Sequence, residues 1–96
     1  MTANRERNMT TTSVSARVRR IIQDQLDLDA ARVKPESSLV DDLGVDSLAL
    51  VEIVLALEDE FDEIDIADEE LGHLAGATVR DVVALVERLL AEGRPT

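Results

Sequence analysis

The sequence predicts an all-α fold, a small four-helix bundle with three main helices, one short third helix and a long loop between the first two. Aliphatic residues recur at helical spacing in three separate segments. Phe61 is the only aromatic residue, and only two prolines and four glycines punctuate the 96 residues, which favours helices over sheets. A chain this short buries one modest core, and compact helix packing uses it economically.

The first helix is predicted to begin near Ser13 and to fade around Leu28. Its apolar residues follow helical spacing and are Val14, Val18, Ile21, Ile22 and Leu26. Residues 1–12 lack any apolar period, so we expect a flexible N-terminal tail at 1–12, a folded domain at 13–92 and a C-terminal tail at 93–96.

The stretch from about residue 29 to residue 46 reads as a long loop because turn-forming residues interrupt it, namely Pro35, Ser37, Ser38 and Gly44. Four aliphatic residues within it are expected to anchor the loop in the core. They are Val33, Leu39, Val40 and Leu43.

The second helix is predicted from Asp46 and Ser47 to about Phe61, and it has two apolar stripes where a bundle helix needs one. The core stripe consists of Leu50, Ile53, Val54, Leu57 and Phe61. The second stripe, Leu48, Val51 and Leu55, lies about 140° away around the helix. Acids lie on or beside this second stripe, namely Glu52, Glu58, Asp59 and Asp62. We interpret it as a docking site; the alternative is that other parts of the domain cover it.

After Phe61, Ile64 and Ile66 alternate as an extended piece, and residues 68–71 predict a brief helix that Gly72 and Gly76 end. Thr78 opens the last helix with a capping-box pattern, Thr78-x-x-Asp81. The core face of this helix is expected to be Val79, Val82, Val83, Val86, Leu89 and Leu90, and Gly93 and Pro95 stop it.

The net charge of −11 is unevenly distributed, since residues 41–70 hold thirteen acids and no Lys or Arg. Such a field repels nucleic acid and anionic membranes and attracts basic protein surfaces. No long apolar stretch follows the N-terminal arginines as in a signal peptide, and the longest apolar runs are too short to span a bilayer, so we expect a cytoplasmic protein. We also expect a monomer. The acidic segment does not place glycine where a calcium-binding loop needs it, and we expect no metal site.

Ser47 is the residue most suited to carry a chemical group. Gly44 allows a tight turn into the second helix, and Ser47 stands in its first turn, where unsatisfied N–H groups favour a phosphate ester. The alternative is that Asp46 or Ser47 merely caps the helix. Enzymatic use of Ser47 is not indicated, because His73 is the only histidine and no G-x-S-x-G motif surrounds the serine.

Four features carry a resemblance to a known family: the string LGVDSL, the apolar helix ending in EDEF, the short acidic segment and the Thr-capped last helix. By these features the chain resembles the acyl carrier protein family from Val14 to Leu90. The resemblance implies that Ser47 receives phosphopantetheine from coenzyme A through a magnesium-dependent phosphopantetheinyl transferase. The thiol of that arm would carry acyl groups as thioesters, although the chain has no cysteine.

The resemblance also implies partners with basic docking patches: an acyltransferase or acyl ligase, a ketosynthase and other biosynthetic enzymes. The positions that match the family's docking surface are Asp46, Leu48, Val51, Glu52, Leu55 and Glu58, with Asp59 beside them. Neutral Ala49 follows DSL where fatty-acid carriers usually have an acid, and Ala67 stands where a proline is common.

The string DSLALVE is more similar to carriers of polyketide pathways. We therefore expect a discrete carrier in polyketide or related natural-product biosynthesis. The alternatives are a fatty-acid synthesis carrier, an aminoacyl or peptidyl carrier, and an unmodified acidic helical adaptor.

Overall fold

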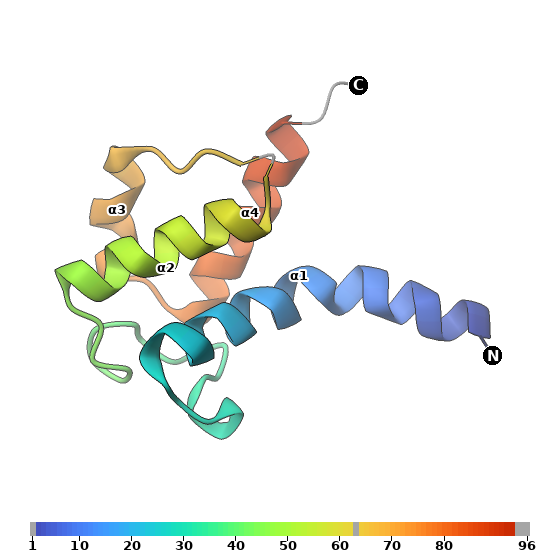
Figure 1. The fold of residues 1–96 in the computed structure, drawn as a ribbon, viewed down its shortest axis with the longest axis horizontal. Helices are drawn as coiled ribbons and strands as arrows, with labels where there is room; N and C mark the ends of the chain where they lie inside the picture. Colours follow the sequence, from blue (N-terminus) through green and yellow to red (C-terminus); the bar gives the residue numbers. More distant parts are fainter. Residues whose placement is uncertain (1, 63, 94–96) are drawn as a thin grey trace.

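In the computed structural model, which describes residues 2–62 and 64–93, four α-helices and one 3-10 turn follow one another along the chain (Figure 1). They are α1 (Thr2–Leu26), η1 (Ala30–Arg32), α2 (Ser47–Glu60), α3 (Asp68–Ala75) and α4 (Val79–Gly93). Helix α1 packs against α2 and α4, and α3 packs against α2. The all-α bundle with a short third helix and a long first loop is therefore confirmed.

Helix α1 begins at Thr2, so the expected start near Ser13 was wrong. The apolar period does begin there, but no glycine or proline lies between Thr2 and Leu26 to interrupt the helical hydrogen bonding. In Figure 1 the first part of α1 extends beyond the other helices. The flexibility of residues 1–12 stays a prediction. In the expected C-terminal tail, Gly93 is the last residue of α4, and residues 94–96 lie outside the described part of the chain.

The end of α1 is set by Asp27, whose φ of 57° is left-handed. The N–H of Leu28 donates to the carbonyl oxygen of Gln23 at 2.9 Å, which is the longer bond of a Schellman motif. Aspartate tolerates this conformation better than most residues do. The helix therefore ends at Leu26 rather than fading around Leu28.

The core includes one face from each long helix, together with residues of the loops and of α3. All five residues of the predicted core stripe of α2 are buried, and Leu57 is fully inaccessible. Val18 and Ile22 of α1 and Val79, Val82 and Val86 of α4 are also buried, as their spacing predicts. Leu85, which the sequence analysis left out of the core, is buried as well, while Val83, Leu89 and Leu90 are only partly buried.

The loop between α1 and α2 is fixed to the start of α4 by backbone hydrogen bonds. Leu39 N–H donates to Ala77 O at 3.0 Å, and Val79 N–H donates to Ser37 O at 2.9 Å. An isolated antiparallel bridge joins Ser38 to Thr78 between them. These bonds fix the middle of the loop, residues 37–39, to the rest of the bundle, and the turn that follows leads to the start of α2.

Three of the four expected loop anchors, Val33, Leu39 and Leu43, are buried. The fourth, Val40, was wrong, because its side chain is 44% exposed. The chain turns tightly between residues 38 and 43, so Leu39 and Leu43 face the core while Val40 faces out. Val45, which was not among the expected anchors, is buried in its place.

Helix α3 runs from Asp68 to Ala75 through Gly72, so the expected end at Gly72 was wrong, whereas the end at Gly76 is confirmed because Gly76 is the C-cap. An isolated glycine is tolerated inside a helix at a cost of about 1 kcal/mol relative to alanine. A Cβ atom added at Gly72 would meet no atom within 4 Å. Leu74 is the buried residue of α3.

Helix α4 begins with the predicted capping box. Thr78 N–H donates to Asp81 Oδ2 at 3.1 Å, and Asp81 N–H donates to Thr78 Oγ1 at 3.3 Å. The shorter aspartate therefore serves in place of the usual glutamate.

Arg17 of α1 holds the C-terminal end of α2. Its Nε donates to Glu60 Oε2 at 2.6 Å, and its Nη2 donates to the Glu60 carbonyl oxygen at 3.2 Å. The guanidinium carbon also lies 4.6 Å from the centre of the Phe61 ring. A cation is favourable at this position because the carbonyl groups of a helix end carry partial negative charge.

Candidate functional site

Ser47 is the first residue of α2, and its side chain is exposed. The preceding turn depends on Gly44, whose φ of 71° is one that residues with a Cβ rarely adopt. Gly44 N–H donates to Val40 O at 3.1 Å, and Val45 N–H donates to Leu39 O at 2.9 Å. The turn expected at Gly44 is thus confirmed, and it presents Ser47 at the surface.

Asp46, rather than Ser47, is the N-cap of α2. Its Oδ1 accepts a hydrogen bond from Ala49 N–H at 2.8 Å. The Ser47 hydroxyl is therefore outside the capping bond, and the residue is exposed to solvent. The partial positive charge of the helix end favours a phosphate ester on Ser47, and the nearby Asp46 carboxylate partly offsets that effect.

A pocket of about 370 Å³ opens beside Ser47. Apolar side chains from three parts of the chain line it, namely Val40 and Val45 from the loop, Leu50 from α2 and Ala75 from the end of α3. The sequence analysis missed this use of Val40, Val45 and Ala75, since no periodic pattern connects the loop with α3. The pocket is large enough for a short apolar group attached at Ser47 to lie against the protein.

The second stripe of α2 is exposed, as the docking interpretation requires. Leu48 is 68% exposed, Val51 41% and Leu55 58%. Within the described residues no other element covers the stripe, so the alternative that the domain covers it is wrong. A contiguous exposed apolar surface of this kind often marks a site of protein interaction.

The acids around the stripe differ in their surroundings. Asp46, Glu52 and Asp59 are exposed. Glu58 is half-buried, and its Oε2 accepts a hydrogen bond from Ile66 N–H at 2.8 Å. The four acidic positions of the predicted partner-binding surface thus all carry a carboxylate at least partly open to solvent. The Glu58 carboxylate is also hydrogen-bonded to the segment before α3.

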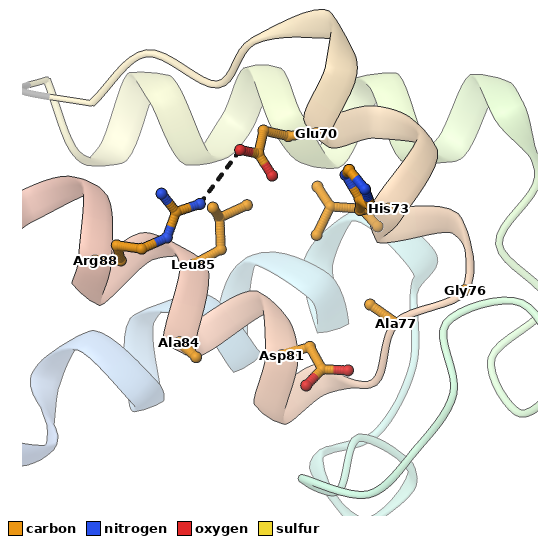
Figure 2. Close-up of a pocket in the computed structure, with 9 residues that line it drawn as sticks. Glu70, His73, Gly76, Ala77, Asp81, Ala84, Leu85 and Arg88 are labelled. Atoms are coloured by element: carbon orange, nitrogen blue, oxygen red, sulfur yellow. Dashed lines mark hydrogen bonds and ion pairs between the residues drawn. The ribbon is translucent and has the colours of Figure 1, made fainter.

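A second hollow, of about 410 Å³, lies between α3 and α4 (Figure 2). Arg88 of α4 and Glu70 of α3 meet across it at 3.2 Å, and this hydrogen bond raises the pKa of Arg88 above its ordinary value. His73 lines this hollow from α3, whereas Ser47 lines the pocket at the start of α2. Ser47 and His73 are therefore not brought together as a nucleophile and its base.

Within residues 2–62 and 64–93, His, Asp and Glu form no group of three or more that could hold a metal ion. No helix there combines the length and the apolar character needed to cross a membrane.

Comparison with known proteins agrees with this arrangement. The family model described as "Phosphopantetheine attachment site" matches residues 16–86. An acyl carrier protein of Clostridium acetobutylicum is 49% identical over 74 residues, covering 77% of this chain and 92% of the relative. One from Bdellovibrio bacteriovorus is 45% identical over 76 residues, covering 79% and 94%. One from Solidesulfovibrio magneticus is 42% identical over 80 residues, covering 83% and 99%.

The chain belongs to the phosphopantetheine-binding acyl carrier protein family. It is a carrier and not an enzyme, and phosphopantetheine is its covalently attached cofactor. Membership of the family implies interaction with a phosphopantetheinyl transferase and with biosynthetic enzymes. The start of α2 fits such a group, because it combines an exposed hydroxyl, a helix N-terminus and an adjoining apolar pocket.

The Asp46 cap is testable by substitution. Asp46→Ala removes the acceptor of Ala49 N–H and should lower the free energy of unfolding by about 0.5–2 kcal/mol. Asp46→Asn keeps an acceptor oxygen and should retain most of the stability of the parent protein. Urea unfolding followed by circular dichroism measures the difference. Asp41→Ala, an exposed acid in the preceding loop, is the control. Equal stability of Asp46→Ala and the parent protein would contradict the assigned cap.

Proposed function

We propose that Ser47 is the attachment residue and that the protein is a discrete carrier in polyketide or related natural-product biosynthesis. The observation that carries the first part is the position of Ser47, which is exposed at the start of α2 beside a pocket while Asp46 does the capping. The proposed carrier domain is residues 13–92, which includes the family match at 16–86. We also propose that it acts as a monomer in the cytoplasm.

Attachment is a simple displacement. The Ser47 oxygen forms a bond to the phosphorus of phosphopantetheine, the pyrophosphate bond of coenzyme A breaks, and its adenosine bisphosphate half leaves. The hydroxyl proton passes to a base of the transferase. Once attached, the arm supplies the thiol that holds an acyl group as a thioester. The chain's own residues then present the serine, offer the apolar pocket and bind the partner enzymes.

The proposed docking surface consists of Asp46, Leu48, Val51, Glu52, Leu55, Glu58 and Asp59. Its exposed apolar stripe suits a partner's apolar contact, and the acids around it suit a partner's Lys and Arg residues. The proposed partners are the transferase, an acyltransferase or acyl ligase, and a ketosynthase.

The choice of pathway rests on the residues after Ser47. Ala49 is half-buried and neutral, so the exposed acids on this part of α2 begin only at Glu52. A carrier with this pattern favours different basic partner surfaces from one with an acid directly after the DSL motif. The relatives' names, acyl carrier protein, do not distinguish the pathways.

The attachment residue is tested by mass spectrometry. Incubation with coenzyme A, magnesium and a broad-range phosphopantetheinyl transferase should add one phosphopantetheine to the chain, and Ser47→Ala should add none. Ser38→Ala, a substitution of a half-buried loop serine, is the control and should still be modified. An unchanged mass of the parent chain would favour the unmodified adaptor instead.

The docking surface is tested by reversing charge. Glu52→Lys and Asp59→Lys should each slow loading by the transferase by roughly tenfold at low salt, with a smaller effect at high salt, because steering by exposed charges is screened. Asp24→Lys makes the same change of net charge on the exposed side of α1 and should load at nearly the parent rate. Equal slowing by all three substitutions would point to net charge rather than to a surface on α2.

The pathway is tested in the producing organism. Deletion of the gene should leave growth without added fatty acids unaffected and should abolish one acyl-derived product. Growth that is lost on deletion and restored by fatty acids would instead assign the protein to fatty-acid synthesis.

A further inference from the structure

Glu58 lies at the edge of the exposed stripe of α2. Around the helix its position falls between Val51, which is exposed, and Val54, which is buried. Its side chain is accordingly half-buried, whereas Glu52 and Asp59 on the other edge of the stripe are exposed. A partner that covers the stripe can therefore approach Glu58 from the solvent side.

The Glu58 carboxylate already has a partner within the protein. Its Oε2 accepts the N–H of Ile66 at 2.8 Å, and the Ile66 side chain is buried. Ile66 belongs to the extended segment that leads into α3 at Asp68. The bond thus joins the docking helix to the segment that sets where α3 begins.

The buried side chains of Ile64 and Ile66 anchor the segment before α3, but few other polar contacts fix the start of this helix. Its N-cap residue, Ala67, makes no side-chain capping bond, and Leu74 is its buried residue. The ion pair of Glu70 with Arg88 lies across the hollow of Figure 2, and its side chains are 28% and 50% exposed. A hydrogen bond to a charged acceptor is stronger than one between neutral groups, so the Glu58 contact contributes much of the polar attachment at this end.

The other end of α3 borders the site. Ala75, its last residue, forms one wall of the pocket beside Ser47. A displacement of α3 therefore changes the shape of that pocket without any change at Ser47 itself.

We propose that Glu58 is a positioning residue that couples docking on α2 to the position of α3. A cationic side chain of a bound partner pairs with the Glu58 carboxylate on the solvent side and draws it away from Ile66 N–H. The segment before α3 is then released, and the wall formed by Ala75 moves away from Ser47. The identity of the partner rests on the proposed function. The hydrogen bond between Glu58 and Ile66 N–H is independent of it. Coupling between two sites is reciprocal. A group that fills the pocket and holds α3 away from Ser47 therefore also raises the affinity of the partner for α2.

The first experiment measures amide hydrogen exchange by NMR in the full apo chain. Glu58→Ala should speed exchange at Ile66 by roughly tenfold, because the N–H loses its acceptor. Glu58→Gln keeps an acceptor oxygen and should change the rate much less. Glu52→Ala, which removes an exposed acid from the same helix, should leave Ile66 unchanged.

Two outcomes of that experiment would overturn the positioning role. One is an unchanged Ile66 rate in Glu58→Ala. The other is an equal acceleration at the core amides of Val82 and Val86, which would show global destabilisation in place of a local release.

The second experiment adds a partner that docks without reacting. In the Ser47→Ala chain, a saturating amount of the broad-range transferase should speed exchange at Ile66. In Ser47→Ala combined with Glu58→Ala it should produce no further increase. Exchange at Ile66 that stays unchanged or slows on docking would refute the coupling. Failure of Ser47 to accept the arm would instead refute the proposed function, and the apo exchange result would be unaffected by it.

Discussion

Helix α2 has more apolar surface than this domain covers. Its buried stripe contacts α1 and α3 and contains Leu57, which is fully inaccessible, while Leu48 and Leu55 are more than half exposed. A domain of this length has too few elements to enclose a helix on all sides. The uncovered stripe therefore follows from the size of the bundle, and Ser47, the attachment residue that we propose, lies at its start.

The start and the end of α2 are built for different tasks. At the start, Asp46 satisfies the helix N–H group, which leaves Ser47 at the surface. At the end, Arg17 binds the carboxylate and the carbonyl oxygen of Glu60 and packs on Phe61. Glu58 joins the same end to the segment before α3. The end of α2 is thus fixed to its neighbours, and the start presents the serine to other proteins.

Much of this arrangement could be predicted from the sequence, because helical periodicity determines which side chains are buried. The two stripes of α2 and the capping box of α4 are local patterns, and the structure has both. The start of α1 could not be placed from apolar periodicity, because the polar first part of this helix has none. Without glycine or proline to stop it, the helix extends back to Thr2. The pocket beside Ser47 was also missed, since Val40 and Ala75 meet only through the tertiary fold. The Glu58 bond to Ile66 likewise has no local pattern.

Gly72 has a consequence for the mechanics of the bundle. There is open space for a methyl group at this position, yet α3 retains glycine, which costs a helix interior about 1 kcal/mol relative to alanine. Packing therefore does not explain the choice. A short helix weakened in its middle is expected to unwind at lower free energy than the long helices around it, so we expect local opening to begin in the helix that lines the pocket beside Ser47.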